Sequence, residues 1–322
     1  MNINRPEDAA EELATVEAAE VGAVGLYLAG LAPGSRRAQA WRLSRAADFL
    51  GVVGPVAWHK LSYQNAVEIR AKAAERYAPR TAASIVAAVR AVAREAWRAG
   101  MMQGEIYRRI QAVPTVKGSS PPAGRWVSRA ELKEVLAACG ASNAGARDAA
   151  LLAVLFGAGL RRGEAVDLDI GDYQPAAELG GATLTVRSGK GRKARQVAID
   201  SGTATAIGHW ARRVDQAEGP LLRSVNKGGA IGPRRLTGES VRRRLVVLCR
   251  RAHVAQFRPH DARRSYASGL LDAGVDLAIV ARLLGHASIQ VTAKYDRRGA
   301  RAEVEAAILV RFPFDPAPDA SE

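Results

Sequence analysis

With 322 residues, 48% of them hydrophobic and 25% charged, the chain has the composition of a folded globular protein and is long enough for two domains. No segment is long and apolar enough to span a bilayer and the first twenty residues are acidic, which excludes a membrane or secreted protein and predicts a cytoplasmic one. The formal net charge of +15, with arginine as 39 of the 47 basic residues, indicates a polyanionic partner. Solvated arginines in an Ala- and Arg-rich protein would give the same total.

The N-terminal part changes sign of charge near residue 21. Residues 1–20 form an acidic extension with a local charge of −5, whereas residues 21–120 carry +10. We expect residues 21–114 to form a basic helical domain that binds DNA. A first helix is predicted between Ser35, as its N-cap, and Gly51, as its C-terminal stop.

A second helix is predicted from Pro79 to Trp97, where apolar residues recur at helical spacing. Its buried stripe consists of Ile85, Val89, Val92 and Ala96. Arginines four residues apart line another face, and with two arginines of the preceding helix they are candidates for DNA-backbone contacts; a solvated helix face explains them equally well. These candidates are Arg36, Arg37, Arg90, Arg94 and Arg98.

Residues 115–125 are rich in Gly, Ser and Pro and predict an interdomain linker. The larger domain expected over residues 126–299 is mainly α, with one small β-hairpin formed by Thr183–Val186 and Arg195–Ile199. The helices predicted in it begin with a capped one at Ser128 and an apolar one at Ala146–Phe156, and continue at Thr203–Val214, Gly238–Ala252, Asp261–Ala273, Leu277–Leu284 and from Ser288 onward. The two cysteines, Cys139 and Cys249, favour neither a disulfide scaffold nor a zinc site.

Four short segments of this domain carry residues suited to phosphate chemistry. In chain order they are GLRRGE at Gly159–Glu164, SGKGRK at Ser188–Lys193, HDAR at His260–Arg263 and LGHASIQVTAKY at Leu284–Tyr295. Together they resemble the signature of the tyrosine recombinase (phage integrase) family, which has a GLRxxE box, a hairpin lysine, an HxxR box and a tyrosine nine residues after an LGH. The basic helical domain is similar to that family's core-binding domain in size, charge and helicity.

The resemblance implies a catalytic domain of the tyrosine recombinase type and a role for each matching residue. Arg161 and Arg263 are the expected phosphate clamp, Lys190, His260 and His286 complete the pocket, Tyr295 is the nucleophile, and Glu164 is expected to hold Arg161. Arg264 stands where many members have another histidine, and Ala262 where a leucine is usual, which leaves the branch of the family open.

The chemistry agrees with these roles. Attack on a phosphodiester builds negative charge that planar, permanently charged guanidinium groups stabilise. A phenol, with a pKa of about 10, needs a base, for which His260 is the candidate, while Lys190 is the candidate acid that protonates the leaving 5′ oxygen. His260 and Arg263, three residues apart, share one helix face. Neither a nucleotide-binding loop nor clustered carboxylates are evident, so we expect no metal and no cofactor.

Taken singly, these residues also have structural explanations: Lys190 as a solvated turn lysine, Arg161 as a cap, His286 and Tyr295 as satisfied core residues. Their joint order and spacing favour catalysis.

The expected function is site-specific recombination of double-stranded DNA at an inverted-repeat site in the nucleoid, through a covalent 3′-phosphotyrosine. We expect a DNA-bound homotetramer that integrates, excises or resolves a mobile element, with a possible directionality factor. A C-terminal helix and tail at residues 300–322 would pack onto a neighbouring subunit. The alternatives are a type IB topoisomerase-like enzyme and a non-catalytic DNA-binding relative.

Overall fold

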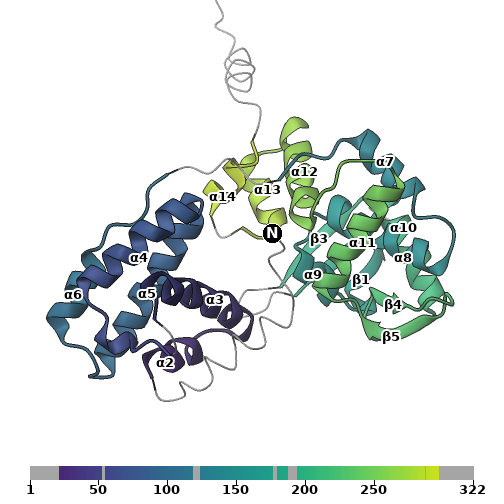
Figure 1. Ribbon diagram of the computed structural model, residues 1–322. Helices are drawn as coiled ribbons and strands as arrows, with labels where there is room; N and C mark the ends of the chain where they lie inside the picture. Colours follow the sequence, from purple (N-terminus) through teal and green to yellow (C-terminus); the bar gives the residue numbers. More distant parts are fainter. Residues whose placement is uncertain are drawn as a thin grey trace, which may run out of the picture. The chain divides into compact units, whose positions relative to one another are not determined.

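The computed structural model describes residues 22–52, 55–118, 124–176, 180–187, 194–286 and 288–296. Three predicted features lie outside the described residues: the acidic extension, the turn that contains Lys190, and the C-terminal helix and tail. The chain divides into two compact units, one ending at Ala123 and the other beginning at Gly124. Both consist mainly of helices, and the second also contains small antiparallel sheets, which confirms the predicted fold class (Figure 1).

The first unit is a helical bundle in which α5 packs against each of the other α-helices. Its elements are α2 (Ala23–Ala29), α3 (Pro33–Leu50), the short 3-10 helix η1 (Trp58–Lys60), α4 (Tyr63–Arg76), α5 (Pro79–Arg98) and α6 (Gly104–Ala112). The predicted apolar stripe of α5 is buried throughout its length. Because α5 is central, its apolar face supplies the middle of this unit's core.

Helix α3 begins before the predicted N-cap. Ser35 lies inside the helix, which starts at Pro33 with Ala32 as its N-cap. Proline suits a first helical position because its φ is already helical and the amide hydrogen it lacks has no partner there. Gly51 ends the helix as predicted, in the left-handed conformation at φ 64°.

The helices predicted in the second unit lie close to their expected positions, and α13 has the predicted bounds, whereas α9 and η3 were not predicted. The helices of this unit are α7 (Arg129–Ala137), α8 (Asn143–Leu152), the π-helical turn η2 (Ala153–Gly157), α9 (Arg162–Asp167), the 3-10 helix η3 (Ile170–Asp172), α10 (Ser201–Val214), α11 (Gly238–Arg251), α12 (Pro259–Asp272), α13 (Leu277–Leu284) and α14 (Ile289–Ala293). Helix α8 starts earlier than predicted because the Ser142 side chain caps it by accepting the amide hydrogen of Gly145.

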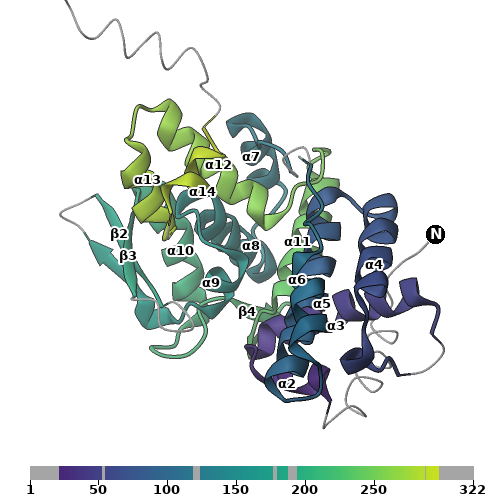
Figure 2. The same cartoon turned by 90° about the vertical axis from the view of Figure 1, so that its left-hand side faces the viewer.

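The second unit contains more strand than the one hairpin predicted. Strands β2 (Gly181–Val186) and β3 (Arg195–Ile199) form that hairpin and are joined by β1 (Tyr173–Ala176) in the order β1-β2-β3. A second sheet pairs β4 (Arg223–Val225) with β5 (Ile231–Arg235). The expectation of one β segment is therefore wrong. Strands β1, β4 and β5 are short and largely polar, so the sequence pattern does not indicate them. Figure 2 shows β2 and β3 side by side, with β2 in contact with α10.

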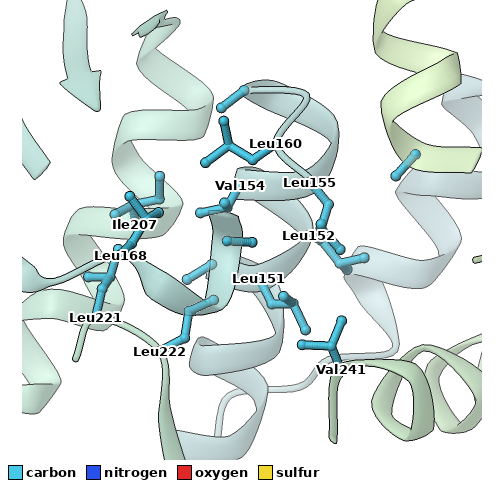
Figure 3. Close-up of a cluster of buried hydrophobic side chains, with 14 of the residues drawn as sticks. Leu151, Leu152, Val154, Leu155, Leu160, Leu168, Ile207, Leu221, Leu222 and Val241 are labelled. Carbon is cyan, nitrogen blue, oxygen red and sulfur yellow. The ribbon is translucent and has the colours of Figure 1, made fainter. Parts of the chain in front are cut away.

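The core of this unit fixes the start of the GLRRGE segment. The apolar residues of α8 and η2 pack against α10 and the segments that follow α9 (Figure 3). Leu160 is fully buried in this cluster, so the residue after it, Arg161, emerges at the edge of the core. Gly159 has φ +61° and lies so close to the Tyr266 ring that a Cβ would be 2.3 Å from it, hence only glycine fits. In the described part of the chain, no helix combines the length and apolarity needed to cross a bilayer.

Candidate active site

Five of the six predicted catalytic residues converge in the second unit. They come from the N-terminal end of α9, the first turns of α12, the residue after Gly285 at the end of α13, and the end of α14. The last three helices are neighbours at one side of the unit (Figure 1 and Figure 2). The five residues are Arg161, His260, Arg263, His286 and Tyr295. The sixth, Lys190, lies outside the described residues.

Arg161 is the N-cap residue of α9 and is held on two sides. Its Nη1 donates to Glu164 Oε1 at 2.7 Å, and its backbone N–H donates to Glu164 Oε2 at 2.9 Å. The guanidinium also donates to the carbonyl oxygens of Leu284 at 3.4 Å and Gly285 at 3.3 Å. With 36% of its side chain exposed, Arg161 still faces solvent and can meet a ligand.

Arg263, on α12, is 1% exposed. Its Nη1 donates to Gly159 O at 2.7 Å, and its Nη2 donates to Leu284 O and contacts His286 Nε2 at 2.9 Å. Burial, and secondarily the charge of Arg161, lower the pKa of Arg263 to about 10. The group is therefore cationic at neutral pH, so the site keeps two positive guanidinium groups around the carbonyls that end α13.

The contacts of His286 define its tautomer. Nε2 faces Arg263, which can only donate, so Nε2 accepts; Nδ1, at 2.7 Å from the buried Thr292 Oγ1, carries the hydrogen. Burial and the neighbouring Arg263 and Arg161 lower the pKa of His286 to about 4. His286 is neutral at physiological pH and orients Arg263.

We expect this depressed pKa to make stability fall in mild acid. The unfolded histidine titrates near 6.5 and the folded one near 4, so the unfolded chain binds the extra proton as pH falls through that window. Glutamine can accept from Arg263 and donate to Thr292 without titrating. His286→Gln should therefore lose less melting temperature than wild type between pH 7 and pH 5. Equal losses in thermal melts of both proteins would contradict the assignment of a neutral His286.

Tyr295 directs its hydroxyl at the imidazole of His260, with 3.1 Å between Tyr295 Oη and His260 Nε2. The Tyr295 ring is buried, and Ser268 Oγ donates to its backbone carbonyl at 2.9 Å. The Arg264 guanidinium lies 5.9 Å from the ring centroid. Burial, Arg263 and Arg264 lower the pKa of His260 below 6.5, which keeps it neutral and able to accept a proton at pH 7.

Glu164 links Arg161 to a second arginine, Arg195, which the sequence motifs do not include. Arg195, at the start of β3, donates to Glu164 Oε2 at 2.9 Å and Oε1 at 3.2 Å. Burial opposes ionisation of Glu164, but hydrogen bonds from Arg195 and Arg161 outweigh it and lower the pKa of Glu164 to about 2. Arg195 lies five residues after Lys190, yet among 39 arginines nothing local distinguishes it.

The arginines predicted to contact DNA in the first unit have protein partners in several cases. Arg36 donates to Leu31 O at 3.1 Å and to Ala29 O at 3.3 Å. Arg90 donates to Thr115 Oγ1 at 3.3 Å, Arg94 and Arg98 approach Glu95 at 3.7 and 3.1 Å, and Arg37 is exposed. Exposed pairs of this kind are weak and can yield to a phosphate. Their role in DNA binding stays a prediction.

Within the residues that the structure describes, no group of three or more His, Cys, Asp or Glu side chains is arranged to hold a metal ion.

Comparison with known proteins decides the family. The model of the phage integrase family matches residues 125–300, more than half of the chain and all four segments of the site. The chain belongs to the phage integrase family. Tyrosine recombinase XerC of Chromohalobacter salexigens is 36% identical over 47% of the chain and 48% of its own length. Tyrosine recombinase XerA of Pyrococcus furiosus is 35% identical over 50% of the chain and 53% of its own length.

The alignments with these two relatives thus span about half of their length. A longer match, to tyrosine recombinase XerC of Herpetosiphon aurantiacus, is 31% identical over 74% of the chain and 79% of that relative. The fold resembles XerH site-specific recombinase bound to palindromic difH substrate, with a TM-score of 0.63 at 20% identity over 92% of the chain and 83% of XerH. It also resembles a lambda integrase dimer bound to a COC′ core site, with a TM-score of 0.61 at 14% identity over 84% of the chain and 91% of the integrase.

Proposed function

We propose that this protein is a tyrosine-type site-specific DNA recombinase that cleaves and rejoins double-stranded DNA through a covalent 3′-phosphotyrosine. The observation that carries the proposal is the Tyr295 hydroxyl at 3.1 Å from His260 Nε2. The Tyr295 ring centroid lies 5.9 Å from that of His286, which contacts Arg263, and Arg263 shares the Leu284 carbonyl with Arg161. A nucleophile, a base and two fixed cations are the groups that in-line attack on a phosphodiester requires.

The proposed reaction begins with transfer of the phenolic proton to His260. The Tyr295 oxygen forms a bond to the scissile phosphorus, and the bond from phosphorus to the 5′ oxygen breaks. Lys190, whose position lies outside the described residues, would protonate that leaving oxygen. Arg161 and Arg263 stabilise the charge on the non-bridging oxygens. A 5′ hydroxyl of another strand then attacks the phosphorus, its proton passes to Lys190, the bond from phosphorus to the Tyr295 oxygen breaks, and His260 returns the proton to the phenolate. Rejoining therefore conserves the phosphodiester and needs no nucleotide.

The protonation states support this division of labour. His260 has a pKa below 6.5, so at neutral pH it is an acceptor rather than a cation. His286 is neutral as well, with a pKa of about 4, and it accepts a hydrogen bond from Arg263. Among the described residues of the pocket, the positive charge therefore resides on the arginines, which stay charged across the working pH range.

The DNA partner we propose is an inverted-repeat recombination site, bound by a homotetramer in the nucleoid. The net charge of +15 supports a nucleic acid partner, and XerH, with a similar fold, is described with a palindromic substrate. The outcome we propose is integration, excision or resolution of a mobile element, with a directionality factor as an accessory partner. Cyclic exchange of residues 300–312 between subunits is part of the same proposal. The mass of the protein–DNA complex tests the tetramer.

A suicide substrate tests the central claim. Footprinting on the DNA that flanks the encoding gene provides the bound site, and a nick beside the scissile phosphate lets the short product diffuse away, so that rejoining fails. We expect a covalent protein–DNA adduct that survives denaturation and maps to Tyr295. Binding without an adduct at every bound site would instead indicate a non-catalytic DNA-binding relative. Relaxation of supercoiled plasmid that lacks the site would indicate a topoisomerase-like enzyme.

A further inference from the structure

We propose that Arg195 is a positioning residue for strand cleavage, which ties β3 both to Glu164 and to the end of α13 and so fixes the two phosphate-binding arginines. The inference rests on the proposed function and assigns Arg195 no contact with the substrate. It assigns catalytic importance to an arginine outside the family motifs recognised in the sequence.

The first tie runs through Glu164. Arg195 presents two nitrogens to the two carboxylate oxygens, at 2.9 and 3.2 Å. The same carboxylate accepts from Arg161, through the side chain and through the backbone N–H. A bidentate pair fixes the plane of a carboxylate as well as its distance. Glu164 can therefore orient Arg161 only in the plane that Arg195 imposes on it.

The second tie runs through the carbonyl groups that end α13. Arg195 Nε donates to Leu283 O at 3.2 Å. The next two carbonyls, of Leu284 and Gly285, accept from Arg161, and Leu284 O also accepts from Arg263. Three successive carbonyls at one helix end thus hold three arginines, as the negative end of the helix dipole favours. A shift of this end would move Arg161 and Arg263 together.

The backbone of Arg195 is well anchored for this purpose. It is paired with Val186 in the antiparallel β2–β3 ladder, and its side chain is 17% exposed. Gly285 packs so tightly on the guanidinium that a Cβ there would be 3.0 Å from an Arg195 nitrogen. Its Nε contacts Leu283 O and its two Nη atoms contact Glu164, so the group holds both of these neighbours at once.

Single-turnover cleavage by the full chain, with DNA affinity and melting temperature measured on the same preparations, tests this role. Arg195→Gln should fold and bind DNA with affinity within about twofold of wild type but cleave about 100-fold more slowly, the scale of a misplacement of roughly 1 Å. Arg195→Lys keeps the charge without the bidentate geometry and should be intermediate.

Arg187 offers the matched control. Arg187 is the residue after Val186, the last residue of β2 and the ladder partner of Arg195. Its side chain is 60% exposed and pairs with the carboxylates of Asp169 and Asp172. Arg187→Gln also removes an arginine–carboxylate pair beside the same hairpin, but we expect cleavage per bound complex within about twofold of wild type, since in the described part of the chain these two aspartates, and not Glu164 or the end of α13, are the partners of Arg187.

A double-mutant cycle with Glu164→Gln separates positioning from general stability. If Arg195 acts largely through Glu164, the double variant should cleave about as slowly as the slower single variant. Multiplicative losses, or cleavage per bound complex equal to wild type in Arg195→Gln, would overturn the inference. Absence of any adduct with the wild-type protein would overturn the proposed function instead, so the two failures are distinguishable.

Discussion

Replacing Tyr295 by phenylalanine is expected to abolish the covalent protein–DNA adduct and leave DNA affinity unchanged. The substitution removes only the hydroxyl, which lies 3.1 Å from His260 Nε2, while the aromatic ring keeps its buried site against α12 and α13. Loss of one hydrogen bond between uncharged groups costs about 1 kcal/mol, so the variant should fold. Adduct formation on the suicide substrate and a binding isotherm on the intact site measure the two effects.

Tyr173→Phe is the control for removal of a tyrosine hydroxyl. The Tyr173 hydroxyl donates to Ala204 O at 3.0 Å, in contact with α10 and apart from the site network. This variant should form the adduct at the wild-type rate. An adduct that persists in Tyr295→Phe would place the nucleophile on another residue, and lost DNA binding would show that the hydroxyl acts in recognition.

Local sequence signals were sufficient for most of the helices and for the contacts within one element. The capping box of Ser128 and Glu131 marks the start of α7, and Gly285 ends α13 where predicted. His260 and Arg263 share a face of α12 because helical periodicity requires it. In these cases the determining residues are within four positions of one another, so the pattern in the sequence contains the information.

Contacts between segments far apart in the sequence could not be predicted from local patterns. Arg161 and Arg263 are anchored by carbonyls of Leu284 and Gly285, and backbone carbonyls leave no mark in a sequence. The role of Arg195 becomes evident only in the folded chain, where β3 places its side chain against Glu164. The short strands β4 and β5 lack an alternating apolar pattern, and their pairing depends on the core beneath them. The family resemblance selected the residues, while the folded chain supplied the network that connects them.

Replacing either of the two arginines proposed to bind the phosphate is expected to remove cleavage, but the two variants should differ in stability. Arg161→Ala removes a partly exposed side chain, and α9 still has its Glu164 contact to the backbone N–H of residue 161. We expect a stable protein that cleaves roughly 10²–10³-fold more slowly, the effect of losing one donor to developing charge. Single-turnover rates on the suicide substrate, together with thermal melts, measure both quantities.

Arg263→Ala should lose cleavage and fold stability together. It leaves the carbonyl of Gly159 without its Arg263 donor, at about 1–3 kcal/mol for an unsatisfied buried group, removes one of the two arginine donors to Leu284 O, and opens a cavity beside α12. Arg223→Ala is the matched control, because Arg223 is equally buried and its donors also meet backbone carbonyls, of Glu218 and Pro220. That variant should lose stability but keep cleavage per folded molecule. The two variants are compared at the same folded fraction. Slower cleavage by Arg263→Ala than by Arg223→Ala would show that the buried guanidinium acts on the phosphate as well as on the fold, and equal cleavage would contradict that role.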